Sequence, residues 1–538
     1  MRKFIFVTGG VLSGLGKGVV TASIGLLLKA QGHRVSLQKI DPYVNVDAGT
    51  MNPYEHGEVF VTQDGKETDL DIGRYERFLD ESLTAAHYFT TGQVYGDVIR
   101  QERAGAYLGK TVQVIPHVTD EIKRLIRLPL ELNEAEIGVI EVGGTVGDIE
   151  GLPFLEALRQ MRDELPREDT FFIHVTLLPH LSSSDEMKTK PTQHSVKELR
   201  AIGIQPDAIV ARADRPLPEP VKEKIALFCD VPRERVIEDP DLPSIYHAPL
   251  IFQEQALPES IASGLNLPPR TPELTTWREH VKRIESPSRS VRIAIVGKYV
   301  ELTDSYISIR EALVHAGASE DIGVEIDWIA AETIAKLGPE ACLVGVDGLL
   351  IPGGFGHRGI EGKVEAVEFV RTNRVPFFGI CLGLQCAVIE YARNVLALEG
   401  ANSSEFDPDS PHPVIALLEE QEDVIQMGGT MRRGIYETVL ADGSVAQSCY
   451  GERTIEERHR HRYEFNPAYV ERFEAAGMRI AGTTTDGLLA EIVEIGEHPW
   501  FVSVQFHPEF TSHFLRAHPL FVGFVRACQE RNSSSSAS

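Results

Sequence analysis

Short runs of consecutive apolar residues alternate with longer segments of mixed character through most of the chain. The runs are rich in Val, Ile and Phe, which favours strands buried on both faces of a parallel sheet. Their alternation with helix-length segments predicts an α/β architecture. The runs predicted as strands are 4–7, 34–38, 137–141, 171–175, 208–211, 291–297, 347–351, 377–380 and 501–504.

The chain has 538 residues, more than one hydrophobic core usually holds, so we expect more than one domain. We predict an N-terminal domain with a phosphate-loop-type parallel sheet over 1–270 and a C-terminal α/β domain over 291–530. The stretch 271–290 is rich in Pro, Thr and Ser and is predicted to be a linker. The serine-rich end, 531–538, is predicted to be disordered.

Composition excludes several classes of function. A net charge of −26 argues against a nucleic-acid-binding surface, which needs a basic footprint. The sequence has no apolar run near the length of a membrane span, and the apolar run after Met1 is too short for a signal peptide. The six cysteines are scattered, without the spacing of a metal site, which favours a reducing, cytoplasmic location.

A glycine-rich loop over 8–18 connects the first strand to an apolar-rich helix over 19–30. Such a loop cradles phosphates with backbone N–H groups and the helix N-terminus, while Lys17 reaches the outer phosphates. The loop departs from the usual phosphate-loop pattern at Val11, in place of a glycine, and at Gly18, in place of the hydroxyl that binds magnesium. Carboxylates must therefore hold the metal, and we predict Glu141, near the end of a strand, and Asp71, on a loop.

The second candidate site is built around Cys381, at the tip of a glycine-flanked turn after the strand 377–380. This is the cysteine form of a nucleophile elbow. His507 and Glu509 follow the strand 501–504 and can act as base and orienting carboxylate, completing a triad. Backbone amides of the glycines at 353–354 and of Leu382 could hold the oxyanion. The other cysteines are predicted to be small buried residues without a catalytic role. They are Cys229, Cys342, Cys386, Cys449 and Cys528.

Several strings together resemble the CTP synthase family. They are 9–18, 39–45, 57–61, 141–150, 188–195, 379–383 and 458–464, and the resemblance covers about 1–527. The Cys and His-x-Glu motifs are shared by many glutamine amidotransferases, whereas the strings at 144–150 and 188–193 are far more specific. The resemblance implies ATP-driven amination of the uracil ring of UTP, with glutamine as nitrogen donor. It also implies Mg²⁺, GTP as an allosteric activator, CTP as a feedback inhibitor and a homotetramer.

The same resemblance assigns binding residues. For ATP it implies Gly14, Leu15, Gly16, Lys17, Gly18, Val19 and Asp71. For UTP or CTP it implies Ser13, Asp148, Ile149, Glu150, Lys188, Thr189, Lys190, Pro191, Thr192, Gln193 and Lys224. For glutamine it implies Gly354, Leu382, Gly383, Leu384, Gln385, Glu405 and Arg462. It further places Lys39 near the nucleotides, His56 and Val59 along an ammonia path, and Arg358 in a GTP-responsive lid over 353–362.

Some alternatives stay open at this point. From spacing alone, Lys188, Lys190 and Lys224 are better read as solvated surface charges, and 458–461 reads as a charged surface run. Another two-domain amidoligase, such as one acting on a corrin acid, would share the phosphate loop and the Cys site but would lack the 188–193 string. A non-catalytic nucleotide-binding scaffold or filament subunit is a third interpretation. A stand-alone glutaminase would leave the first half of the chain unexplained.

Overall fold

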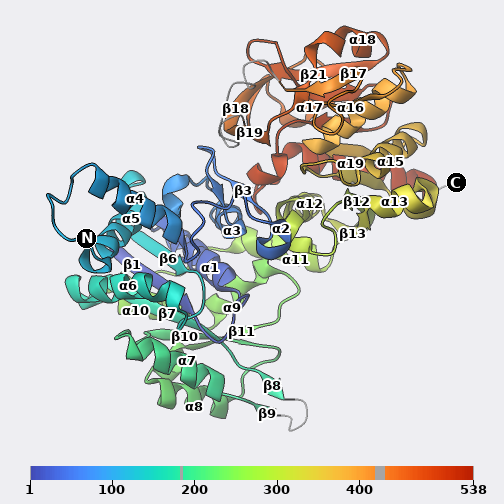
Figure 1. Ribbon diagram of the computed structural model, residues 1–538. Helices are drawn as coiled ribbons and strands as arrows, with labels where there is room; N and C mark the ends of the chain where they lie inside the picture. The colour runs from blue at the N-terminus through green and yellow to red at the C-terminus, as the bar shows by residue number, and fades with distance from the viewer. Residues whose placement is uncertain (1, 182–185, 418–430, 537–538) are drawn as a thin grey trace. The chain divides into compact units, whose positions relative to one another are not determined.

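The computed structural model describes residues 2–181, 186–417 and 431–536 (Figure 1). The chain divides into two compact units. The first unit contains Met1–Thr50 and Asp71–Val281, and the second contains Met51–Leu70 and Lys282–Ser538. The division after Val281 falls within the stretch 271–290. The segment Met51–Leu70, which precedes most of the first unit in sequence, belongs to the second unit.

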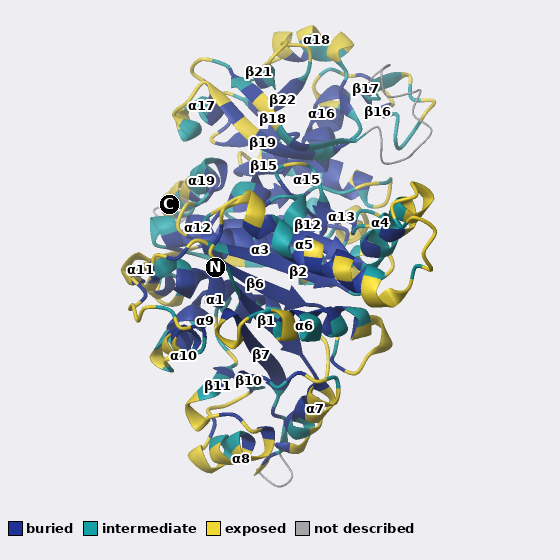
Figure 2. Cartoon of the chain, turned by 90° about the vertical axis from the view of Figure 1, so that its left-hand side faces the viewer, coloured by how far each residue is buried: buried dark blue, intermediate teal, exposed yellow. Residues whose placement is uncertain are grey.

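The first unit is built on a seven-stranded sheet in the order β11-β10-β7-β1-β6-β2-β5, and all neighbouring strands are parallel. Figure 2 shows β1, β2, β6 and β7 buried along most of their length, as the apolar runs predict. The strands are β1 (Lys3–Gly9), β2 (Val35–Asp41), β5 (Tyr88–Thr90), β6 (Ile137–Val142), β7 (Thr170–Leu177), β10 (Ala208–Ala213) and β11 (Val236–Pro240). A short hairpin, β8 (His180–Leu181) with β9 (Glu186–Met187), lies outside this sheet.

Helices cover both faces of this sheet. Phe4, Phe6 and Phe172 point to the face covered by α5 and α6, whereas α1, α9 and α10 contact the opposite face. The helices are α1 (Lys17–Ala30), α3 (Leu70–Leu79), α4 (Thr91–Arg103), α5 (Thr119–Leu132), α6 (Leu152–Glu164), α7 (Lys190–Ala201), α8 (Glu219–Cys229), α9 (Ala248–Glu254), α10 (Leu257–Gly264) and α11 (Thr275–Glu285).

The second unit is built on a nine-stranded mixed sheet in the order β13-β12-β14-β15-β23-β22-β21-β18-β19. The strands from β13 to β23 are parallel, and β22, β21, β18 and β19 extend the sheet in antiparallel fashion. The strands are β12 (Arg289–Gly297), β13 (Ile322–Ala330), β14 (Gly348–Ile351), β15 (Phe377–Ile380), β18 (Arg432–Leu440), β19 (Thr454–His461), β21 (Met478–Thr484), β22 (Ala490–Ile495) and β23 (Phe501–Val504). The short strands are β3 (Phe60–Val61), β4 (Glu67–Thr68), β16 (Ala401–Ser403), β17 (His412–Ala416) and β20 (Glu464–Phe465).

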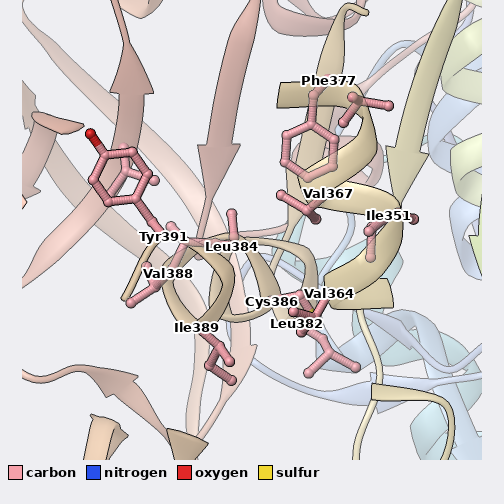
Figure 3. Close-up of a cluster of buried hydrophobic side chains, with 14 of the residues drawn as sticks. Ile351, Val364, Val367, Phe377, Leu382, Leu384, Cys386, Val388, Ile389 and Tyr391 are labelled. Carbon is pink, nitrogen blue, oxygen red and sulfur yellow. The ribbon is translucent and has the colours of Figure 1, made fainter. Parts of the chain in front are cut away.

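An apolar cluster beneath α16 fixes the helix that follows Cys381. Figure 3 shows Leu382, Leu384 and Val388 of α16 among side chains from α15 and the sheet, including Val367 and Phe377. The helices of this unit are α2 (Pro53–His56), α12 (Ile307–Glu320), α13 (Ala331–Leu337), α14 (Pro339–Leu343), α15 (Ile360–Thr372), α16 (Leu382–Asn394), α17 (Val445–Tyr450), α18 (Val470–Ala475) and α19 (Pro519–Ser536).

The C-terminal end differs from the sequence prediction. The sequence predicts disorder over 531–538, but α19 continues to Ser536, and 537–538 lie outside the described residues. Helix α19 packs on α12 and β12. Because this packing already fixes the helix, its serine-rich C-terminal residues continue in helical conformation. Within the described ranges, no helix combines the length and apolarity needed to span a lipid bilayer.

Candidate active sites

The glycine-rich loop connects β1 to α1 and has the backbone of a phosphate loop. Gly14 and Gly16 have φ values of 74° and 88°, and Gly16 caps α1 directly before Lys17. Val11 has a φ of 81°, a left-handed conformation that normally favours glycine. The residue that departs from the usual sequence pattern therefore keeps the conformation that glycine would supply.

Lys17 folds back across the loop. Its Nζ donates a hydrogen bond to the carbonyl of Gly144, in the turn after β6. A Cβ at Gly9 would lie 2.6 Å from Lys17 Cδ, so the glycine leaves room for the side chain where it crosses the backbone. Burial, opposed by the charge of Glu141, lowers the pKa of Lys17 to about 8, which still leaves most of this ammonium charged at neutral pH.

The position of Asp71 explains why residue 18 is a glycine. A Cβ at Gly18 would overlap the Oδ1 atom of Asp71, so no side chain fits at the position where a magnesium-binding hydroxyl is usual. The sequence placed Asp71 on a loop, which is wrong, because Asp71 lies in the first turn of α3. The helix holds the carboxylate against the start of α1, in the space that a Ser or Thr side chain would take.

Two carboxylates converge at this point on one positive charge. Strand register places Lys39 of β2 beside Glu141 of β6, at the carboxyl ends of the strands, where ligands bind in open α/β sheets. Lys39 Nζ lies 3.0 Å from Glu141 Oε1 and also bonds Asp71, while Tyr75 donates to Glu141. Burial alone would raise the pKa of Glu141, but the charges of Lys39 and Lys17 lower it.

This arrangement fits a magnesium ion bound with nucleotide. Asp71 and Glu141 already share one cationic group, and Mg²⁺ usually takes one or two protein carboxylates and fills its remaining positions with water and phosphate oxygens. Across 2–181, 186–417 and 431–536, no cluster of three or more His, Cys, Asp or Glu residues forms a closed metal cage. The donor set therefore suits a metal shared with a substrate.

Asp239 is a residue near the loop that sequence reasoning missed. It lies buried near the end of β11, 3.8 Å from the position that a Cβ on Gly16 would take, and 3.3 Å from Arg212. Burial raises its pKa to about 6. The available signal was an aspartate two residues after the apolar pair Val236 and Ile237, in a segment short enough to be a strand.

The predicted pyrimidine-nucleotide residues are distributed around the start of α7. Thr189 and Lys224 line one open cavity of about 460 Å³, and Lys190 and Gln193 line another of about 310 Å³. Lys188 precedes α7 and pairs with Glu186. Pro191 occupies the first turn of α7.

Other predicted contacts lie elsewhere in the unit. Thr192 is buried and bonds Thr176, so its side chain supports α7 rather than facing a ligand. The turn after β6 carries Asp148 and Glu150, both exposed, and Ile149, which is 81% exposed. Neither cavity includes these three residues. Ser13 is exposed within the phosphate loop.

The glutaminase candidate has a strained elbow. Cys381 follows β15 and precedes α16, with φ 51° and ψ −99°, a conformation that non-glycine residues rarely adopt. Its N–H donates to the carbonyl of Val504 over 2.7 Å. A Cβ at Gly383 would overlap the carbonyl of Ile351, and one at Gly379 would lie 2.7 Å from Ser503 Oγ, so both flanking glycines are required.

The three predicted triad residues come together. His507 Nδ1 lies 2.7 Å from Glu509 Oε1, and the imidazole stacks on Phe510 with ring centroids 5.0 Å apart. Burial would lower the pKa of His507, but Glu509 and Cys381 outweigh it and raise the pKa to about 10. Gln505 Nε2 donates to Cys381 Sγ over 3.6 Å. This geometry suits thiolate attack with the imidazolium as proton donor.

The residues expected to hold glutamine surround Cys381. A Cβ at Gly353 would lie 2.7 Å from His507 Cε1, and one at Gly354 would lie 3.4 Å from Leu382 Cδ2, so this strand end passes beside the nucleophile. The side chains of Leu382 and Leu384 are buried in the apolar cluster of Figure 3, so these two residues can reach a ligand only through their backbone.

The residues predicted to hold the glutamine amino and carboxylate groups, Glu405 and Arg462, interact electrostatically. Glu405 Oε1 accepts a hydrogen bond of 2.7 Å from the N–H of Gly356. Burial raises the pKa of Glu405, and the positive charges of Lys298 and Arg462 oppose this effect. Gln385 is buried, and its Nε2 donates to the carbonyl of Tyr463 over 3.2 Å, which gives this side chain a supporting role.

Comparison with known proteins identifies the family of this chain. The sequence matches the family models described as CTP synthase N-terminus, over 3–267, and glutamine amidotransferase class-I, over 301–527. The CTP synthase of Rippkaea orientalis is 54% identical over 99% of this chain and 98% of its own length. The CTP synthase of Geobacillus kaustophilus is 55% identical over 98% of this chain and 99% of its own. This chain belongs to the CTP synthase family. A solved glutaminase domain of Trypanosoma brucei CTPS, with bound acivicin, is 36% identical and covers 45% of this chain and 94% of that one, with a TM-score of 0.43.

The run 458–461 of this CTP synthase family member also differs from the sequence prediction. Spacing alone favours a charged surface run here, but Arg458, His459 and His461 are buried. The carbonyl of Arg458 accepts the N–H of His507 over 2.8 Å, and Arg460 bonds Glu67 over 2.8 Å. Strand β19 therefore supports the triad.

The segment Met51–Leu70 is part of this same unit. Arg458 Nη1 donates to the carbonyl of Val61 over 3.1 Å, and Phe60 packs edge-on against Phe510, with ring centroids 4.9 Å apart. Glu67 binds both Arg433 and Arg460, each over 2.8 Å.

The residues predicted for an ammonia path and for a lid belong to this unit as well. Val59 is buried and His56 is exposed at the end of α2. Arg358 donates to the carbonyl of Lys298 over 3.0 Å and lies over the ring of Tyr299.

Proposed function

We propose that this chain converts UTP to CTP, with ammonia from glutamine as the nitrogen source and ATP as the energy source. The observation that supports the proposal is that one chain holds two separate groups of reactive side chains. One is the triad of Cys381, His507 and Glu509. The other is the phosphate loop ending at Lys17, with the Asp71 and Glu141 carboxylates beside it.

In the glutaminase half, the thiolate of Cys381 attacks the side-chain amide carbon of glutamine. The carbon–nitrogen bond breaks, a glutamyl thioester forms, and the nitrogen leaves as ammonia with a proton from His507. Glu509 holds the imidazole in place through its bond to Nδ1. Water then attacks the thioester, with His507 as base, and releases glutamate and the thiol.

In the synthetase half, the γ-phosphoryl group of ATP is transferred to O4 of the uracil ring, which gives ADP and a phosphorylated pyrimidine. Ammonia attacks C4 and the O4 oxygen leaves with the phosphate, which yields CTP. Lys17 and Lys39 neutralise phosphate charge during transfer. A magnesium ion, which Asp71 and Glu141 would hold, adds charge neutralisation and orientation when bound.

Regulation and assembly form a finer part of the proposal. The family resemblance supports GTP activation through the lid 353–362, feedback inhibition by CTP, and a homotetramer. The exposure of Ile149, away from both cavities around α7, is consistent with a pyrimidine site that a neighbouring copy completes. The six free cysteines support a reducing compartment, the cytoplasm.

The test is an assay of CTP formation, in which the absorbance of CTP is monitored. The reaction contains UTP, ATP, magnesium and either glutamine or ammonia. Cys381→Ala should lose glutamine-dependent synthesis and retain ammonia-dependent synthesis. Lys17→Ala should lose both. Cys342→Ala is the matched control, because this cysteine lies outside the triad, and it should keep both activities. No CTP from either nitrogen source with the wild-type chain would refute the proposal.

A further inference from the structure

A row of buried hydrogen bonds lies beneath the phosphate loop and takes no part in the chemistry described above. Strand register places Thr8 of β1 beside His174 of β7. Thr8 Oγ1 lies 2.9 Å from His174 Nδ1, and His174 Nε2 lies 2.7 Å from Ser195 Oγ, on α7. All three residues are buried, and His174 has no exposed surface.

The hydrogen-bonding roles in the row depend on the tautomer of His174. Thr8 Oγ1 is 3.3 Å from the carbonyl of Ile173 and can donate only there or to His174. With Thr8 donating to that carbonyl, Nδ1–H of His174 donates to Thr8 and Nε2 accepts from Ser195. Burial, and then the charge of Lys17, lower the pKa of His174 to about 3, so the imidazole is neutral and able to accept.

The phosphate loop rests directly on this row. A Cβ at Gly10 would overlap Ser195 Oγ and would lie 3.0 Å from His174 Nε2. The N–H of Gly10 donates to the carbonyl of Val175, the residue after His174, over 3.1 Å. A displacement of α7 therefore pushes Ser195 against the backbone of the phosphate loop. Conversely, a displacement of the phosphate loop pushes Gly10 against Ser195 and α7.

A second polar pair fixes the first turn of α7. Thr176 Oγ1, two residues beyond His174 on the same face of β7, lies 3.0 Å from Thr192 Oγ1, and Thr192 Oγ1 lies 3.2 Å from the carbonyl of Leu177. Apolar packing tolerates sliding of a helix along a sheet, whereas buried hydrogen bonds require one register. The start of α7, which carries the predicted pyrimidine-nucleotide string, is therefore linked by hydrogen bonds to β7, the strand that also carries His174.

We propose that His174 is a positioning residue that ties the ATP loop to the start of α7, so that occupation of either nucleotide site aligns the other. The proposal rests on the proposed function, which assigns ATP to the loop and the pyrimidine triphosphate to the 188–193 string. His174 reaches neither ligand, because it lies under Gly10 with no exposed surface. It acts through Thr8 and Ser195.

The experiment measures ammonia-dependent CTP synthesis for Ser195→Ala, His174→Asn and the double variant. Asn keeps a donor near the position of Nδ1 and loses the group that binds Ser195. The matched control is Ser36→Ala, which removes a buried hydroxyl of β2 that has no hydrogen-bond partner among the described residues. Two measurements check that each variant is folded. One is a melting curve, and the other is glutamine hydrolysis without nucleotides, an activity of the other unit.

Each single variant should raise the KM for ATP and the KM for UTP by about fivefold, the effect of one net hydrogen bond, with kcat little changed. In the wild type, saturating ATP should lower the KM for UTP, and this dependence should weaken in both variants. The double variant should match the single ones, because both substitutions break the same link. Ser36→Ala should leave all these values unchanged.

The inference is overturned if only one of the two KM values rises, if the two substitutions are additive, or if the KM for UTP keeps its full dependence on ATP. A wild-type chain that makes no CTP refutes the proposed function separately. In that case, calorimetric titration of ATP and UTP, each with and without the other, still tests the link. Equal linkage in wild type and Ser195→Ala overturns the inference.

Discussion

Replacing Glu509 by glutamine tests the electrostatics of the triad. Glu509 is buried, and its Oε1 lies 2.7 Å from His507 Nδ1. The environment raises the pKa of His507 from 6.5 to about 10, which corresponds to about 5 kcal/mol in favour of the charged ring. Burial is the largest influence on this pKa and acts to lower it, so removal of the Glu509 charge should leave His507 neutral at pH 7.5.

The sign of the pH dependence follows from the direction of the shift. Because the pKa of His507 is raised in the folded state, its protonated form stabilises the fold fully below pH 6.5, and this contribution is lost as the pH rises through about 10. The difference in melting temperature between wild type and Glu509→Gln should therefore be largest below pH 6.5. It should disappear above pH 10.

Glutamine hydrolysis should fall by about 10²–10⁴-fold in Glu509→Gln at pH 7.5, because the leaving nitrogen loses its proton donor. The assays are glutamate release and alkylation of Cys381 by iodoacetamide, each followed against pH. Ammonia-dependent CTP synthesis should not change. Glu497→Gln, an exposed carboxylate in the same unit, is the matched control. A folded Glu509→Gln variant with the wild-type pH profile for both assays would refute this account of the triad.

Three further predictions concern the synthetase half. Asp71→Asn and Glu141→Gln should each abolish CTP formation from glutamine and from ammonia, and should weaken Mg²⁺-dependent ATP binding in calorimetry; normal binding in both would place the metal elsewhere. Lys188→Ala and Lys224→Ala should raise the KM for UTP by about tenfold, the effect expected for one charge-assisted hydrogen bond, without changing the KM for glutamine. Gly18→Ser should lower stability by about 1–3 kcal/mol in urea unfolding and reduce ATP binding, because its Cβ would overlap Asp71; a stable variant with wild-type affinity contradicts the packing described here.

Local signals in the sequence predicted the parts of the structure that depend on neighbouring residues. The strand that precedes Lys17 and the one that precedes Cys381 were recognisable from apolar runs followed by glycines. The triad was recognisable because His507 and Glu509 lie two residues apart after a strand. In each case the turn geometry requires particular residue types, so the sequence carries the information directly.

Features set by distant partners were not recognisable. Asp71 is helical because α3 begins at Leu70, although a Gly- and Asp-rich stretch also suits a loop. The run 458–461 is highly charged, and its burial depends on partners such as Glu67, far away in sequence. Long-range pairing of this kind overrides local composition, and a single sequence gives no direct sign of it.

The discontinuity of the second unit limits how these chains can be recombined. Residues 51–70 contribute Phe60 to the packing behind His507 and Glu67 to the pair of arginines at 433 and 460. A hybrid that takes only the C-terminal half from a relative would set foreign arginines against a native Glu67. Exchange of the glutaminase unit between relatives therefore requires three junctions in the hybrid sequence, one on each side of 51–70 and one near 282. Substitutions at Phe60 and Phe510 should be made together, because the two rings pack against each other.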